Sequence, residues 1–363
     1  QEILFQEPGF EVLSLEVRNA KQVRVRVQIA ADCRLGEHPL RLRCASGLST
    51  LRTFFVGALP IANEREDQGN DDFSHPARID LNRTIHGQIT SEDVDYFAFQ
   101  GSAGQRVTAE IEAMRLGGAV FDPYVAILDS NRFEIVASDD TALARQDSIA
   151  STLLPADGIY IVEVRESAYG GGNDFFYRLH LGTLPLPLTA IPSGARPGET
   201  LEVRFLGDPG GEITRTISVP EVATGTIGLW VEDEQGISPS PVPFHVKDLA
   251  GTVESEPNPS RRQAQEISIP GAIHGVLQEP GDQDFFRFTA RKGETLDIRV
   301  RSRSLRSAVD PVINIWQSGG KHLSGNDDAA RQPDSAVRLE IPEDGEYDLR
   351  IRDFLRRGGP AHA

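Results

Sequence analysis

Acidic side chains are the residues of this sequence whose types and spacing could do chemistry. Three oxygen-bearing residues alternate in a polar stretch near position 254, and two aspartates alternate just before an apolar run that begins at Phe285. In an extended chain alternate side chains point to the same side, so each set presents its oxygens together. A calcium ion takes about six to eight oxygen ligands of this kind. The residues are Glu254, Glu256, Asn258, Asp282 and Asp284.

A second interpretation of these carboxylates needs no metal ion. An aspartate just before a strand can accept backbone N–H groups in a turn, and exposed glutamates can simply be solvated. Asp284 and the similarly placed Asp95 fit this interpretation as well. The residues alone leave both alternatives open.

Catalytic motifs are missing from the sequence. It contains no His-Glu-x-x-His zinc motif, no Gly-x-Ser-x-Gly nucleophile motif and no Gly-x-x-x-x-Gly-Lys phosphate loop. Its carboxylate pairs have no recognisable partner base. We therefore expect that the chain is not an enzyme, with an unrecognised hydrolase as the least favoured alternative.

The charge balance also narrows the choice of partners. The 363 residues include 37 basic and 54 acidic side chains, a net charge of −17, so general binding to nucleic acid or to an anionic membrane is not expected. No apolar run approaches the length that crosses a bilayer, so membrane insertion is not expected either. The start at Gln1 does not resemble a signal peptide, and we expect a mature or excised piece.

One basic cluster interrupts this acidic background. Its residues are Arg299, Arg301, Arg303 and Arg306, and the first three alternate along one predicted strand face. The corresponding positions of an earlier segment carry Glu110 and Glu112. The cluster is either a solvated strand face or a docking patch for an acidic glycan or an acidic neighbouring module.

The two cysteines, Cys33 and Cys44, lie close together in the sequence. A disulfide between neighbouring strands would suit an exported protein, and two reduced thiols are the alternative. Their spacing does not match a zinc motif.

The elements that must position these residues are predicted to be β-strands. Segments such as 23–29, 296–300 and 347–351 alternate apolar and polar residues, the period of a strand with one face in a core and one in water. Helical periodicity is nearly absent, and Gly and Pro are frequent. The sequence therefore predicts an all-β protein built of tandem β-sandwiches.

An internal duplication organises the chain. The matching segments recur at an offset of 187 to 189 residues, so two copies of one domain are predicted. They are Ile85-His86-Gly87 with Ile273-His274-Gly275, Asp95-Tyr96-Phe97 with Asp284-Phe285-Phe286, Asp122-Pro123 with Asp310-Pro311, and Pro155-Ala156-Asp157-Gly158 with Pro342-Glu343-Asp344-Gly345.

A weaker repeat precedes each copy, which gives four predicted domains. The boundaries are a partial small domain at 1–57, a large one at 58–184, a second small one at 185–250 and a second large one at 251–363. The first small domain is expected to lack a counterpart of Gly198–Val203, and the last large one its final strand. Either the chain is a fragment, or another chain supplies a strand.

The repeated motifs resemble the bacterial pre-peptidase C-terminal domain family, once in residues 63–181 and again in 254–363. The small domains resemble immunoglobulin-like domains of the IPT/TIG class, and the alternation resembles large exported proteins of planctomycete-type bacteria. The resemblance implies jelly-roll-like sandwiches that act outside the cytoplasm as accessory modules and not as catalysts.

The resemblance also implies calcium. In the collagen-binding relatives this segment and the aspartates before the next strand hold the ion, which assigns Glu254, Glu256, Asn258, Asp282 and Asp284 in the second copy. The same positions of the first copy are Glu64, Glu66, Asp93 and Asp95. The first copy departs from the pattern because it lacks the Pro-Asn pair and carries an insertion through Asn70-Asp71-Asp72.

These inferences combine into one expectation. The chain is predicted to be an extracellular, cell-surface or periplasmic segment that binds polymer or spaces other domains of a larger exported protein. Its partners would be other domains of the same polypeptide, neighbouring protein chains or an extracellular polymer. The alternative is a structural subunit of a surface array or filament completed by strand exchange between chains.

Overall fold

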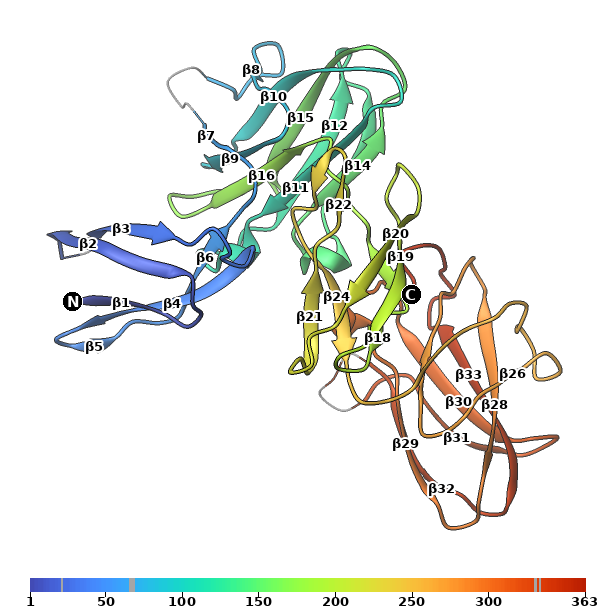
Figure 1. The fold of residues 1–363 in the computed structure, drawn as a ribbon. Helices are drawn as coiled ribbons and strands as arrows, with labels where there is room; N and C mark the ends of the chain where they lie inside the picture. Colours follow the sequence, from blue (N-terminus) through green and yellow to red (C-terminus); the bar gives the residue numbers. More distant parts are fainter. Residues whose placement is uncertain (21, 65–68, 330–331, 333) are drawn as a thin grey trace. The chain divides into compact units, whose positions relative to one another are not determined.

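The computed structural model describes residues 1–20, 22–64, 69–329, 332 and 334–363 (Figure 1), and β-strands make up nearly all of its regular structure. The prediction of an all-β protein is confirmed. The chain divides into two compact units: unit 1 comprises Gln1–Pro185 with Glu232–Ser240, and unit 2 comprises Leu186–Val231 with Pro241–Ala363. The four predicted domain boundaries are finer than this division and stay a prediction. Among the described residues no helix could cross a membrane.

The N-terminal part of unit 1 forms one sheet around β4 and one separate hairpin of β2 with β3. The strands are β1 (Glu2–Phe5), β2 (Phe10–Asn19), β3 (Gln22–Ile29), β4 (Gly36–Cys44), β5 (Gly47–Leu48) and β6 (Arg52–Val56).

The hairpin corrects one expectation. β2 follows Pro8-Gly9 just as β19 (Thr200–Leu206) follows Pro197-Gly198, so the strand predicted to be missing has a counterpart. The register of β2 shifts between Val12 and Ser14, and this irregularity breaks the alternation by which the strand could be recognised.

Cys33 and Cys44 are free thiols in the structure. The Sγ atom of Cys44 lies 3.1 Å from the Oγ atom of Ser46. This arrangement favours the alternative of two reduced thiols.

The first repeat consists of two five-stranded sheets whose inner residues share one core. The first sheet has the order β13 (Glu134–Ser138), β12 (Pro123–Asp129), β15 (Gly158–Glu166), β10 (Val94–Gly101) and β8 (Ala77–Arg78). The second has the order β14 (Ile149–Leu153), β11 (Arg106–Glu112), β16 (Phe176–Gly182), β9 (Arg83–Gln88) and β7 (Ile61–Asn63). The 3₁₀ turns η2 (Met114–Leu116) and η3 (Ala142–Ala144) connect strands.

Unit 2 begins with two three-stranded sheets around a core that includes Phe205 and Phe244. The first sheet has the order β17 (Thr189–Ile191), β19 and β20 (Ile213–Ser218). The second has the order β18 (Gly194–Ala195), β24 (Val242–Val246) and β21 (Gly225–Leu229). The short hairpin of β22 (Glu232–Asp233) and β23 (Gly236–Ile237) belongs to unit 1.

The second repeat reproduces the first sheet but divides the other. A five-stranded sheet has the order β26 (Gln265–Glu266), β28 (Gln283–Ala290), β33 (Gly345–Asp353), β30 (Pro311–Gln317) and β31 (His322–Asn326). Two separate pairs are β25 (Gly251–Val253) with β27 (Ala272–His274), and β29 (Thr295–Arg299) with β32 (Ala336–Glu340). The 3₁₀ turn η4 covers Arg303–Leu305.

The aromatic residues of the repeat motifs lie in the two cores. Tyr160 and Tyr347 are buried, and their hydroxyl groups donate to the carbonyl oxygens of Ala156 at 2.8 Å and Glu343 at 2.6 Å. These bonds satisfy the hydroxyl groups and close the Asp-Gly turn next to each strand.

Candidate metal centre

The carboxylate of Glu254 is fixed by the backbone of the β25–β27 pair. The backbone N–H of Glu254 donates to the carbonyl oxygen of His274 at 2.8 Å, and the Glu254 carboxylate accepts the N–H of Val276. A Cβ atom on Gly275 would lie 2.2 Å from Oε2 of Glu254, so only glycine leaves room for this side chain. The absence of a side chain at position 275 thus places Glu254 against the strand.

Asn258 is fully buried and joins the N-terminal segment of the second repeat to its first long strand. The backbone carbonyl oxygen of Asn258 accepts the N–H of Phe285 at 3.0 Å. With the side-chain nitrogen facing the carboxylates, it donates to Asp284 at 3.1 Å and to Glu256 at 3.3 Å. Carboxylates only accept hydrogen bonds, so this orientation of the amide is the one that satisfies both partners.

The two aspartates of the second repeat have different roles. Asp282 accepts the N–H groups of Gln278 at 2.7 Å and Gln283 at 2.8 Å, so it caps the turn before β28. Asp284 is buried and points toward the N-terminal segment. One oxygen each from Glu256, Asp282 and Asp284 lies within 4.8 Å of the others.

The first repeat builds a similar arrangement from a different sequence. The N–H of Glu64 donates to the carbonyl of His86 at 2.9 Å, and its carboxylate accepts the N–H of Gln88 at 3.0 Å. The side-chain amide of Asn70 donates to Glu64 at 2.8 Å and to Asp95 at 3.0 Å. The carbonyl of Asn70 accepts the N–H of Tyr96 at 2.8 Å, as that of Asn258 accepts Phe285.

Asp71, Asp93 and Asp95 form the acidic group of the first repeat, with one oxygen each within 4.8 Å of the others. Asp93 caps a turn by accepting the N–H of Thr90 at 2.9 Å. Asp95 accepts from the side chains of Asn70 and of Tyr177, the latter at 2.6 Å. The turn-capping alternative therefore describes Asp93 and Asp282, whereas Asp95 is held by side chains.

Sequence reasoning missed two residues of this site and named one that the structure does not describe. Asn70 and Asp71 belong to the group, although the first repeat was expected to lack the asparagine. The signal was present in the insertion Asn70-Asp71-Asp72, which carries an asparagine followed by two aspartates. Glu66 lies outside the described residues.

Burial makes these carboxyl groups hard to ionise together. It raises the pKa of Asp95 to about 10, assisted by the hydrogen bond and charge of Glu64. Burial and the charge of Glu254 raise the pKa of Asp284 to about 9, and burial raises that of Glu254 to about 7. Asp95 and Asp284 therefore favour the protonated form at neutral pH, and a nearby cation would favour their ionised form.

The donor set fits a hard divalent cation. The side-chain oxygens grouped within 4.8 Å of one another all belong to carboxylates, a ligand type that Ca²⁺ prefers. Among the described residues Oε2 of Glu254 is buried and accepts no hydrogen bond. A cation held by Glu256, Asp282 and Asp284 would offset the negative charges that add to burial in raising the pKa of Asp284.

The arginine cluster of the second repeat does not form one strand face. Arg299 is the last residue of β29 and pairs with Asp297 at 2.7 Å. Arg303 starts the turn η4 and pairs with Asp310 at 3.3 Å, and Arg306 follows that turn with a φ of 60°. The chain bends there because Asp334 accepts the N–H groups of residues 302–304, so only Arg299 and Arg301 lie at alternate positions of the extended segment.

Part of the chain is similar to a known bacterial protein. Over 107 residues, 29% of this chain, it is 36% identical to a protein of Deinococcus radiodurans described as a probable subtilase-type serine protease. The chain spans about 15% of the length of that relative. No family model matches the chain.

Two solved structures are among those to which the chain is similar. The pre-peptidase C-terminal domain of a collagenase from Bacillus anthracis aligns with 29% of this chain and 93% of that domain, at 17% identity and a TM-score of 0.24. A Bacteroides ovatus protein of a mixed-linkage glucan utilization locus, in complex with a mixed-linkage heptasaccharide, aligns with 96% of this chain and 91% of its own, at 11% identity and a TM-score of 0.17.

Proposed function

We propose that this chain is a non-catalytic accessory or scaffold segment of an exported protein, in which each repeat binds one Ca²⁺ where the chain enters it. One observation carries the proposal: the same group of Glu, Asn and two Asp recurs in both repeats. The amide of Asn70 contacts a glutamate six residues earlier and that of Asn258 contacts one two residues earlier, yet both amides contact the same aspartate position. Unrelated surface acids would not keep such contacts across different sequences.

The cation would act as a clamp. Glu64 and Asn70, like Glu254 and Asn258, precede the first long strand, whereas Asp95 and Asp284 belong to that strand. A cation between the two groups ties the N-terminal segment of each repeat to its core. The direction in which the chain enters the repeat then becomes fixed, which is what a spacer between other domains needs.

The finer architecture belongs to the same proposal. Each repeat would be a jelly-roll-like β-sandwich at 58–184 and 251–363, alternating with immunoglobulin-like domains at 1–57 and 185–250. Support comes from the repeated motifs and from the separate cores of residues 85–181, 190–246 and 286–349.

The proposal places the chain outside the cytoplasm, where calcium is abundant. Extracellular calcium modules bind the ion at roughly 10⁻⁴ to 10⁻³ M, a range that a site with few fully ionised ligands can reach. The partners would be neighbouring domains, other protein chains or an extracellular polymer.

Thermal unfolding of the whole chain with calcium and with chelator tests the clamp. A site filled at ten times its dissociation constant adds about 1.4 kcal/mol to the stability of its repeat. We expect millimolar Ca²⁺ to raise the melting temperature and titration calorimetry to find two sites. Asp95→Asn and Asp284→Asn should each remove one site, and the double variant should remove the response.

Asp174→Asn is the matched control, because Asp174 is an exposed aspartate of the first repeat outside the acidic group. Its response to calcium should equal that of the unaltered chain. A melting temperature that does not change across millimolar calcium at neutral pH would contradict the proposal.

A further inference from the structure

The outer face of the five-stranded sheet in the second repeat carries several arginines. The five strands follow the same order as those of the matching sheet in the first repeat, so this face needs no further strand. In β33, Leu349 and Ile351 pack in the core. Because side chains alternate along a strand, Arg350 and Arg352 lie on the opposite, outer face of the sheet.

The side-chain hydrogen bonds of Arg350 go to neutral amide groups. Its guanidinium donates to Oδ1 of Asn314 at 2.6 Å and to Oε1 of Gln283 at 3.3 Å. Its Nε atom is buried and has no hydrogen-bond partner among the described residues. Burial and the charge of Arg352 lower the pKa of Arg350, assisted by the charge of Arg261. Neutral amides do not balance a positive charge, so an anion would be stabilised beside Arg350.

An aromatic ring lies among these arginines. Trp316 of β30 is partly exposed, and its ring centroid lies 6.2 Å from that of Phe285. The guanidinium carbons of Arg261 and Arg350 lie 4.4 Å and 5.2 Å from the centroid of the Trp316 ring. The electron-rich face of the ring attracts both cations. Trp316 therefore keeps two arginines beside one apolar surface.

The first repeat places an acidic residue on the matching face. The strand registers put Glu163 at the position of Arg350, and Leu128 at that of Trp316. Glu163 forms an ion pair with Arg165 at 3.2 Å. The charge at this position is therefore balanced within the first repeat, whereas the second repeat leaves it for an anion.

The arrangement favours a ligand that combines carboxylates with apolar ring faces. A guanidinium binds a carboxylate through two parallel hydrogen bonds, a geometry for which arginine is the preferred residue. The ring of Trp316 can pack against the apolar C–H face of a sugar. Each unit of a uronic acid polymer supplies both groups, whereas an acidic peptide supplies carboxylates without sugar rings. The observations therefore favour a polysaccharide over a peptide.

We propose that this face of the second repeat binds an acidic polysaccharide built of uronic acids. Arg261, Arg350 and Arg352 hold its carboxylates, and Trp316 packs against a sugar ring. The inference rests on the proposed function, since it names the class of extracellular polymer that the accessory segment binds. It requires no calcium ion.

The fluorescence of Trp316 tests the proposal on the full chain. The chain has two tryptophans, so Trp230→Phe leaves the emission of Trp316 alone. Tetramers of galacturonate, glucuronate and mannuronate are titrated in the presence of chelator, and we expect at least one to change this emission saturably. The neutral tetramer of the same sugar and tetraglutamate should each bind about tenfold or more weakly, because each lacks one of the two kinds of contact.

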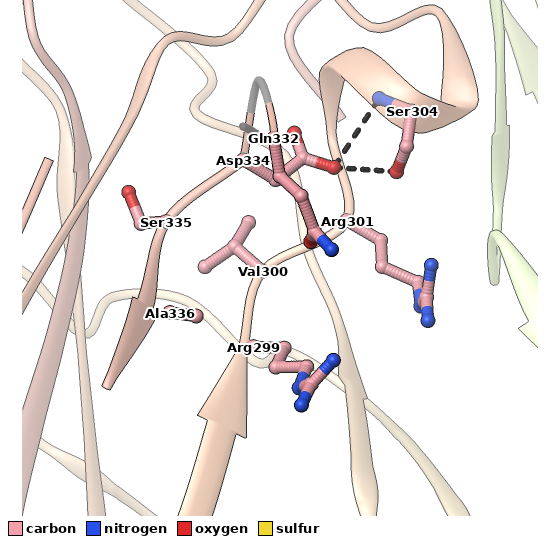
Figure 2. A pocket seen from close by; sticks show the side chains of 8 residues that line it. All are labelled: Arg299, Val300, Arg301, Ser304, Gln332, Asp334, Ser335 and Ala336. Carbon is pink, nitrogen blue, oxygen red and sulfur yellow. Dashed lines mark hydrogen bonds between the residues drawn. The ribbon is translucent and has the colours of Figure 1, made fainter. Parts of the chain in front are cut away.

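Arg261→Gln/Arg352→Gln is the informative variant in this background. It should keep the fold, which circular dichroism checks, and bind the acidic tetramer about tenfold or more weakly. Arg299→Gln/Arg301→Gln is the matched control, because both side chains are exposed and β29 lies outside this sheet. Figure 2 shows these two arginines beside a pocket that Asp334 also lines. The control should bind like the unaltered chain.

Four outcomes would overturn the proposal: no saturable change with any acidic tetramer, equal affinity for the neutral tetramer, equal affinity for tetraglutamate, or equal affinities of the two arginine variants. Equal affinity for tetraglutamate would assign the face to an acidic peptide. Because chelator is present throughout, none of these outcomes bears on the calcium clamp. A melting temperature that calcium does not change would likewise leave the sugar binding unaffected.

Discussion

Asn70 and Asn258 contact the same aspartate position in the two repeats, although their glutamate partners, Glu64 and Glu256, stand at different positions. The backbone carbonyl of each asparagine accepts the N–H of the residue that follows the buried aspartate. The side-chain amide of each asparagine donates to that aspartate and to a glutamate of the N-terminal segment. A neutral donor between carboxylates lowers their repulsion without adding charge. The asparagine therefore organises the acidic group before any cation arrives.

Replacement of this asparagine should destabilise the chain. In Asn258→Ala the buried carboxyl of Asp284 loses its amide donor, which costs about 1–3 kcal/mol. We expect a lower melting temperature of unit 2 by calorimetry, with Asn173→Ala, at an exposed loop position, as the control. An unchanged transition would show that Asn258 does not hold the group together.

The stability of the calcium-free chain should fall as the pH rises. The pKa values of Asp95 and Asp284 are raised in the folded state to about 10 and 9, from an unfolded value near 3.8. Protonation of such groups stabilises the fold below the unfolded pKa, and this contribution is lost as pH rises through the folded pKa. Melting temperatures in chelator should therefore decline between about pH 4 and pH 10.

Calcium should oppose this decline, because it binds the ionised carboxylates and releases their protons. The calcium-induced rise in melting temperature is thus expected to grow with pH. The double variant Asp95→Asn/Asp284→Asn should show a flatter profile in chelator. A calcium effect that is largest at acidic pH would be incompatible with this linkage.

A buried ion pair of the first repeat gives a second test, because the second repeat has a serine at the corresponding position. Arg115 is almost fully buried and bonds Glu110 at 3.0 Å and Asp147 at 2.6 Å. Arg115→Ala leaves two buried carboxylates without their cation, and breaking such a pair costs about 3–5 kcal/mol. Urea unfolding of unit 1 measures the loss.

Ser304→Ala is the matched substitution in the second repeat. Ser304 bonds Asp334, but that carboxylate also accepts the N–H groups of Ser302 and Arg303, so the loss should be about 1 kcal/mol. Equal effects of the two substitutions would refute the different roles assigned to these positions.

Removal of the hydroxyl group from a core tyrosine should cause a smaller loss of stability than the substitution of Arg115. Tyr347→Phe removes a hydroxyl that donates to the carbonyl of Glu343 and keeps the ring in place. We expect a loss of about 0.5–1.5 kcal/mol in unit 2. Tyr124→Phe is the control, since that hydroxyl bonds an exposed glutamate at 3.1 Å. A larger loss for the control would be the contradicting result.

Local patterns determined much of the fold. The alternation at 296–300 and 347–351 predicted the strands β29 and β33, and the duplication matched Phe97 with Phe286, both of which lie in cores. Strand β2 was missed because its register shifts after Val12, which breaks the alternation. The arginine cluster was placed on one strand because the bend imposed by Asp334 comes from a residue about 30 positions away.

The sequence by itself determined the all-β class, and it predicted the duplication and the acidic residues of each candidate site. Only the tertiary structure decided that Asn70 takes the place of Asn258, and that Asp93 and Asp282 cap turns while Asp95 and Asp284 accept from the asparagine side chains. Alternation and repetition are properties of neighbours along the chain, so they can be recognised there. Hydrogen-bond partners and strand neighbours are fixed by packing between distant segments, which no local spacing records.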